Sequence, residues 1–109
     1  MAMPVDRRLA AIMAIDVVGY SRLVEADEAA TLAAIKELRQ QAIDPLLAEY
    51  HGRIFKLMGD GAIVEFASVV DAVACAVAIQ KAVADRQAKS PSDRRIVFRI
   101  AVNLGVVVG

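Results

Sequence analysis

The chain has 109 residues, of which 58% are hydrophobic, and its 13 Lys and Arg residues balance its 13 Asp and Glu residues. This length fits a single domain, and a formal net charge of zero gives no indication of the basic surface that nucleic-acid-binding proteins carry. The apolar run near the N-terminus is interrupted by Asp16 and is too short to span a membrane. A single cysteine, Cys75, has no internal partner for a disulfide, which indicates a cytoplasmic protein. The mean hydropathy of +0.50 is high for a small monomer and indicates that part of the surface packs against another surface.

The first half of the chain reads as a strand followed by a long helix. Residues 8–18 (RLAAIMAIDVV) form an apolar run of strand length, which predicts a strand buried on both faces. After Gly19 and the short connection SRLVEA, Asp27 is placed to cap a helix whose apolar residues recur every three or four positions. Pro45 predicts a kink or a break near Asp44, and the helical pattern ends at residues 51–52.

The second half begins with a hairpin. Residues 53–58 and 62–66 read as two short strands joined by the turn Gly59, Asp60 and Gly61. Ser68 then caps a helix that extends to about residue 87, with Asp71 at the position where a capping box has Glu or Gln. Residues 88–94 are a predicted loop, and residues 95–108 are a predicted final strand.

This order of elements predicts the α+β class with a ferredoxin-like βαββαβ core, in which an antiparallel sheet carries its helices on one face. Right-handed crossovers give the strand order four, one, three, two, so the first and third strands are antiparallel neighbours. Asp16 ends the first strand and Asp60 precedes the third. The topology therefore predicts that the two carboxylates meet at one edge of the sheet.

Two carboxylates at one edge repel each other unless a divalent cation binds both of them. Asp16 and Asp60 are therefore candidate ligands of Mg²⁺ or Mn²⁺. Taken alone, Asp16 is better explained as a residue that caps the following turn, and Asp60 as an ordinary hairpin residue.

Two further features have both an ordinary and a functional explanation. The turn formed by Val18, Gly19, Tyr20 and Ser21 offers backbone N–H groups to a phosphate, although a glycine there also simply lets the strand turn. Lys56 lies among apolar residues of the hairpin, where it either protects an edge strand or donates a hydrogen bond to a ligand.

Three segments together resemble the catalytic domain of class III adenylate/guanylate cyclases. They are the segment AIDVVGYS around Asp16, the segment KLMGDG from Lys56 through Asp60, and the segment SVVDAV from Ser68. The resemblance covers nearly all of residues 1–109 and corresponds to the N-terminal part of such a domain. It implies an enzyme that converts ATP to cyclic AMP and pyrophosphate in intracellular signalling, as a homodimer with shared active sites.

The same resemblance assigns roles to individual residues. It implies that Asp16 and Asp60 hold two Mg²⁺ or Mn²⁺ ions, with a backbone carbonyl from Val17 completing the metal site. Val18, Gly19, Tyr20 and Ser21 would present amides to the phosphates of the substrate. Lys56 matches the position that contacts the purine, and a lysine there implies adenine.

Some features of the family lie outside this chain. Relatives continue into a segment with a second base-recognition residue and with an asparagine and an arginine that stabilise the transition state, and these are absent before Gly109. Val106 stands where relatives usually have a polar residue, and Leu57 and Met58 replace a pair that is commonly polar. We therefore expect the 109-residue chain alone to be inactive.

Two alternative functions remain open at this point. One is a non-catalytic nucleotide-binding or dimerisation module derived from a cyclase. The other is a different enzyme on a ferredoxin-like fold, such as a diguanylate cyclase or a polymerase-like transferase, against which the segment from Lys56 to Asp60 argues.

Overall fold

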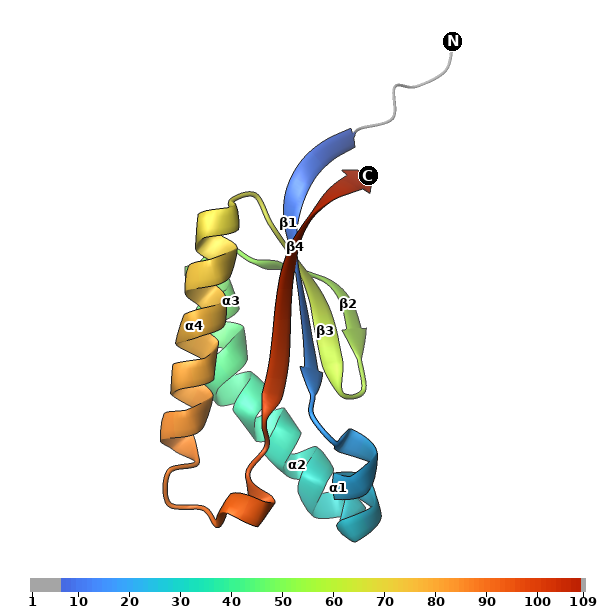
Figure 1. The fold of residues 1–109 in the computed structure, drawn as a ribbon, viewed down its shortest axis with the longest axis vertical. Coiled ribbons are helices and arrows are strands. Elements are labelled where there is room, and N and C mark those ends of the chain that lie inside the picture. Colours follow the sequence, from blue (N-terminus) through green and yellow to red (C-terminus); the bar gives the residue numbers. More distant parts are fainter. Residues whose placement is uncertain (1–6, 109) are drawn as a thin grey trace.

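Four antiparallel strands form the sheet, and the helices cover one of its faces (Figure 1). The computed structural model describes residues 7–108. Its main elements, in chain order, are β1 (Arg7–Val17), α1 (Tyr20–Ala26), α2 (Glu28–Leu38), α3 (Asp44–Glu49), β2 (Arg53–Met58), β3 (Gly61–Phe66), α4 (Val69–Arg86) and β4 (Phe98–Val108). The strand order is β2-β3-β1-β4, which confirms the predicted ferredoxin-like arrangement.

The core lies between the helix-covered face of the sheet and helices α2, α3 and α4. Along β1, Ala11, Met13 and Ile15 point into this core, whereas Ala14 is exposed on the other face. The prediction that this strand is buried on both faces is therefore wrong. The reason is that side chains alternate between the two faces of a strand, and small apolar residues such as Ala14 occur on an uncovered face as well. The largest fully buried side chains are those of Phe66, Met13, Ile79, Val64 and Cys75.

The connection after β1 contains a helix that the sequence did not predict. Residues 20–26 form α1, and its first intrahelical bond joins the N–H of Leu23 to the carbonyl of Gly19. Gly19 adopts a left-handed conformation with φ of 67°, which glycine tolerates without strain. None of the residues of α1 is fully buried, so this short helix has no apolar periodicity by which it could be recognised.

The long predicted helix is present and is broken at the predicted place. Asp27 caps α2 by accepting a hydrogen bond of 3.0 Å from the N–H of Ala30. A π-helical turn, Arg39–Ile43, then leads into α3, where Pro45 lies in the first turn. Because Pro45 has no N–H to donate and its ring crowds the preceding turn, the helix widens there, and the N–H of Asp44 bonds to the carbonyl of Arg39.

The second half of the chain also follows the prediction, with one change at the start of β4. Ser68 caps α4 by accepting a 3.2 Å hydrogen bond from the N–H of Asp71, and the helix ends at Arg86. The last strand begins at Phe98 and not at residue 95. Its start is delayed because the side chain of Gln87 binds both backbone groups of Ile96, at 2.7 and 2.8 Å. Within residues 7–108, no helix is long and apolar enough to cross a membrane.

Candidate metal and nucleotide site

Asp16 and Asp60 lie at the same end of the sheet, as the predicted topology requires. Asp16 is the residue before the end of β1 and pairs with Gly61, which directly follows Asp60. The N–H of Val17 donates a 3.1 Å hydrogen bond to the carbonyl of Asp60. In Figure 1 the end of β1, the turn between β2 and β3, and the start of β4 all lie at the end of the sheet next to α1. The two acidic residues are therefore held together by main-chain bonds.

The pairing at this point depends on the absence of a side chain at Gly61. A Cβ atom there would collide with the carbonyl oxygen of Ile15 and would lie 3.1 Å from the Cα atom of Asp16. Gly59, on the other side of Asp60, has only the hydroxyl of Tyr20 nearby, 3.9 Å from where its Cβ would be. Gly61 thus permits the close approach of β3 to β1 that positions Asp60 beside Asp16.

Asp16 lies on the face of the sheet that the helices leave open, and there it meets a cation that the sequence analysis did not identify. Arg99 of β4 is its direct cross-strand partner, and the Arg99 Nη2 atom lies 2.9 Å from the Asp16 Oδ2 atom. The hydrogen bond from the guanidinium and the charge of the carboxylate raise the pKa of Arg99. The predicted strand order already placed β4 beside β1, but the sequence did not show which residue of β4 pairs with Asp16.

The other carboxylate oxygen of Asp16 indicates how a metal ion fits this site. Asp16 Oδ1 is buried and has no hydrogen-bond partner within the described part of the chain. A buried carboxylate oxygen without a partner is unfavourable, and a cation removes that penalty. Among residues 7–108 no group of three or more His, Cys, Asp or Glu side chains is placed to hold a metal. The pair Asp16 and Asp60 suits Mg²⁺, which binds one or two carboxylates and takes its other ligands from water and substrate phosphates.

The segment that follows β1 carries backbone amides at the same end of the sheet as Asp16. The N–H of Val18 donates a 2.8 Å hydrogen bond to the carbonyl of Val97, so in this conformation it is already engaged. The first intrahelical bond of α1 starts at Leu23, and no side chain among the described residues caps this helix. The N–H groups of Tyr20, Ser21 and the next residue consequently have no partner within the helix, as is usual for a first turn.

Lys56 lies on the same open face as Asp16, two strands away. It pairs with Ile63 of β3, and Ile63 pairs with Ala14 of β1. Directly paired residues of antiparallel strands project from the same face, so Lys56, Ala14 and Asp16 share that face. The side chain of Lys56 is exposed on the edge strand β2, where a β-bulge interrupts the pairing just before it.

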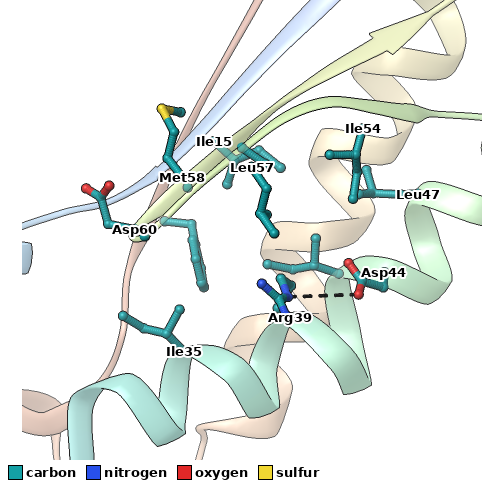
Figure 2. Close-up of a pocket in the computed structure, with 14 residues that line it drawn as sticks. Ile15, Ile35, Arg39, Asp44, Leu47, Ile54, Leu57, Met58 and Asp60 are labelled. Atoms are coloured by element: carbon teal, nitrogen blue, oxygen red, sulfur yellow. Dashed lines mark ion pairs between the residues drawn. The ribbon is translucent and has the colours of Figure 1, made fainter. Parts of the chain in front are cut away.

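A small cavity lies behind the hairpin, on the helix side of the sheet (Figure 2). Its volume is about 40 Å³, and apolar side chains such as Ile35, Leu47 and Leu57 line it. The pair Arg39 and Asp44 stands at its edge, and in Figure 2 the carboxylate of Asp60 points away from this pair. A cavity of this size is far smaller than ligand pockets of roughly 300 Å³ or more, so it does not accommodate a nucleotide.

Comparisons with known proteins agree with the resemblance noted in the sequence. No family model matches the chain. A protein named "Putative adenylate cyclase 3" from Rhizobium meliloti (strain 1021) is 48% identical over 104 residues, which is 95% of this chain and 18% of that protein. The chain thus spans about a fifth of the length of this curated relative.

Solved structures of nucleotide cyclases have the same fold as this chain. An adenylate/guanylate cyclase/hydrolase from Silicibacter pomeroyi is 41% identical with a TM-score of 0.87, over 96% of this chain and 61% of that one. The adenylyl cyclase CyaB from P. aeruginosa matches 97% of this chain and 60% of its own with a TM-score of 0.78, and at 19% identity it supports the fold alone. The chain therefore has the fold of class III adenylate/guanylate cyclase catalytic domains and is similar to them in sequence.

Proposed function

We propose that this chain forms the metal-binding and ATP-binding part of an adenylate cyclase domain, a cytoplasmic signalling enzyme that converts ATP to cyclic AMP and pyrophosphate. The observation that carries the proposal is the main-chain pairing that brings Asp16 and Asp60 to one end of the sheet. The buried and unpartnered Oδ1 atom of Asp16 supports a cation at this place.

In this proposal Asp16 and Asp60 hold two Mg²⁺ or Mn²⁺ ions, and the carbonyl of Val17 completes the metal site. When bound, these ions would lower the pKa of the ribose 3′-hydroxyl and neutralise charge on the phosphates. The amides of the segment from Val18 to Ser21 would orient the phosphates, with Gly19, Tyr20 and Ser21 contributing N–H groups that make no hydrogen bond within α1.

Lys56 is the residue that we assign to recognition of adenine. Its exposed position on the open face, the face that also carries Asp16, supports this assignment. A lysine that donates a hydrogen bond to a ring nitrogen of adenine would face a donor in guanine, and the mismatch would leave a polar group unpaired. Selectivity for ATP over GTP should therefore fall in a Lys56→Ala variant.

We further propose that the complete domain acts as a homodimer in which β2 contributes to the interface. All six residues of β2 are exposed, and four of them are large apolar residues: Ile54, Phe55, Leu57 and Met58. An exposed apolar edge strand is a liability for a monomer, because it exposes both apolar surface and unpaired backbone groups. A Phe55→Ser variant should shift the sedimentation of the protein from dimer towards monomer, while Val70→Ser, a change at an even more exposed apolar residue of α4, should not.

The metal and nucleotide assignments can be tested on this chain by measuring binding of a fluorescent ATP analogue in the presence of Mn²⁺. Asp16→Asn and Asp60→Asn should each weaken Mn²⁺-dependent binding at least tenfold. Asp85→Asn is the matched control, because Asp85 is an exposed carboxylate near the end of α4. Equal affinities in the unmodified chain and the three variants would contradict the assignment of the metal site. A folded intact gene product that makes no cyclic AMP from ATP in the presence of Mn²⁺ would contradict the proposed cyclase activity.

A further inference from the structure

The ion pair between Arg99 and Asp16 stands where the proposed metal site would be. The Nη2 atom of Arg99 lies 2.9 Å from Asp16 Oδ2, so one oxygen of a candidate metal ligand already has a cationic partner. The backbone favours this arrangement, because Arg99 and Asp16 are directly paired within the continuous eleven-residue ladder between β1 and β4. The register therefore keeps the two side chains opposite each other on the same face of the sheet.

We propose that Arg99 is a placeholder cation, which pairs with Asp16 until a divalent ion binds and leaves Asp16 when the ion does so. This inference rests on the proposed function and adds a residue that sets the metal concentration at which the site fills. A guanidinium and a divalent ion cannot both lie against one carboxylate without strong mutual repulsion. Binding of the metal must therefore displace Arg99 or work against its charge.

Arg99 and Asp16 differ in mobility, as an exchange of Arg99 for a metal ion requires. The Arg99 side chain is 69% exposed and makes no other hydrogen bond or ion pair within residues 7–108, so it can swing into solvent at little cost. Asp16 is held in place, since its backbone pairs with both β3 and β4 and its Oδ1 atom is buried. The carboxylate thus stays fixed while its partner can change.

The competing explanation is a permanent surface ion pair whose only effect is a small gain in stability. Exposed pairs of this kind contribute little to folding, so stability alone does not distinguish the two explanations. Metal affinity does distinguish them, because only a placeholder competes with the metal. By reciprocity, a metal that weakens the ion pair must itself be weakened by the ion pair.

The test is the affinity of this chain for Mn²⁺ alone, measured by electron paramagnetic resonance of the free ion. Arg99→Gln should bind Mn²⁺ about three- to tenfold more tightly than the unmodified chain, while Arg99→Lys, which keeps the charge, should stay near it. Lys81→Gln is the matched control for the loss of one positive charge, since Lys81 is exposed on α4. Its affinity should be unchanged. Urea unfolding of each variant verifies that it is folded.

A second measurement follows Arg99 directly. The NMR signal of the Arg99 side-chain Nε–H group should move towards that of a solvated arginine as diamagnetic Mg²⁺ is added, and it should not move in Asp60→Asn. If the unmodified chain binds Mn²⁺ and Arg99→Gln binds it equally or more weakly, the placeholder role is refuted while the metal site stands. If neither the unmodified chain nor Arg99→Gln binds Mn²⁺, the proposed metal site itself fails and the placeholder role fails with it.

Discussion

Replacement of Gly61 by alanine should damage the candidate site more than any other single methyl group in the hairpin. The new Cβ would collide with the carbonyl oxygen of Ile15 and would lie 3.0 Å from its carbonyl carbon. Since ordinary carbon contacts need about 3.5–4.0 Å, β1 and β3 would have to separate by roughly 1 Å at this point. Overpacking of this kind costs about 1–3 kcal/mol of unfolding free energy, and in a chain of this size it lowers Tm by roughly 5–20 °C.

The same displacement should weaken metal binding beyond its effect on stability. Gly61 is the cross-strand partner of Asp16 and the neighbour of Asp60, so the strands would separate at the two candidate metal ligands. Metal sites tolerate displacements of about 0.5 Å, and loss of supporting geometry typically costs about 10- to 100-fold in affinity. We therefore expect Mn²⁺ affinity to fall at least tenfold in Gly61→Ala.

Gly59→Ala is the matched control, because it adds the same methyl group on the other side of Asp60. Its Cβ would have only the Tyr20 hydroxyl nearby, at 3.9 Å, and its backbone is not in the left-handed region. This variant should remain within about 1 kcal/mol of the unmodified chain in urea unfolding and should keep its affinity for Mn²⁺. If Gly61→Ala matched Gly59→Ala in both measurements, the close approach of β1 and β3 would not be what positions the site.

Three further predictions concern the stability of the fold, each measured by urea unfolding. Ser68→Ala removes the side chain that caps α4 and should cost about 1 kcal/mol, and Ser68→Asp should restore most of it. Met13→Ala removes a fully buried side chain from the centre of the core and should cost about 2–5 kcal/mol, whereas Ala14→Ser on the exposed face of the same strand should cost under about 1 kcal/mol. Burial, together with the nearby charge of Glu49, raises the pKa of the Cys75 thiol from 9.0 to about 11. Because the thiol ionises at lower pH in the unfolded chain than in the folded one, its contribution to stability is complete below pH 9 and is lost as pH rises towards 11. The free energy of unfolding should therefore fall by about 1 kcal/mol by pH 10 relative to that of Cys75→Ala. A parallel pH dependence in both proteins would contradict this prediction.

Features that depend on local chemistry were predicted correctly from the sequence. Asp27 and Ser68 cap their helices as expected, because the preference for such residues at a helix start arises from one hydrogen bond a few residues away. The break before Pro45 follows from its missing N–H. The strand order was predicted as well, because right-handed crossovers leave one arrangement for this order of elements.

Features that depend on tertiary packing were not predictable in this way. The apolar residues of β1 predicted a strand buried on both faces, in conflict with the ferredoxin-like topology that places the helices on one face only, since residue type alone does not report what lies opposite. Helix α1 has seven residues and none that is fully buried, which leaves no periodic pattern. Arg99 was missed for a third reason. A shift of one residue in the register between β1 and β4 would place it on the opposite face, and the sequence does not specify this register.

The candidate site is therefore specified at two levels that respond differently to mutation. Asp16 and Asp60 are brought to the same end of the sheet by main-chain pairing, which most side-chain substitutions leave intact but which a single methyl group at Gly61 should disrupt. Its charge balance depends on Arg99, whose contribution should change with one side-chain substitution and leave the backbone unaffected. A variant at Gly61 should thus lower stability and metal affinity together, whereas a variant at Arg99 should raise metal affinity with little change in stability. These opposite patterns separate the geometry of the site from its electrostatics within one small set of proteins.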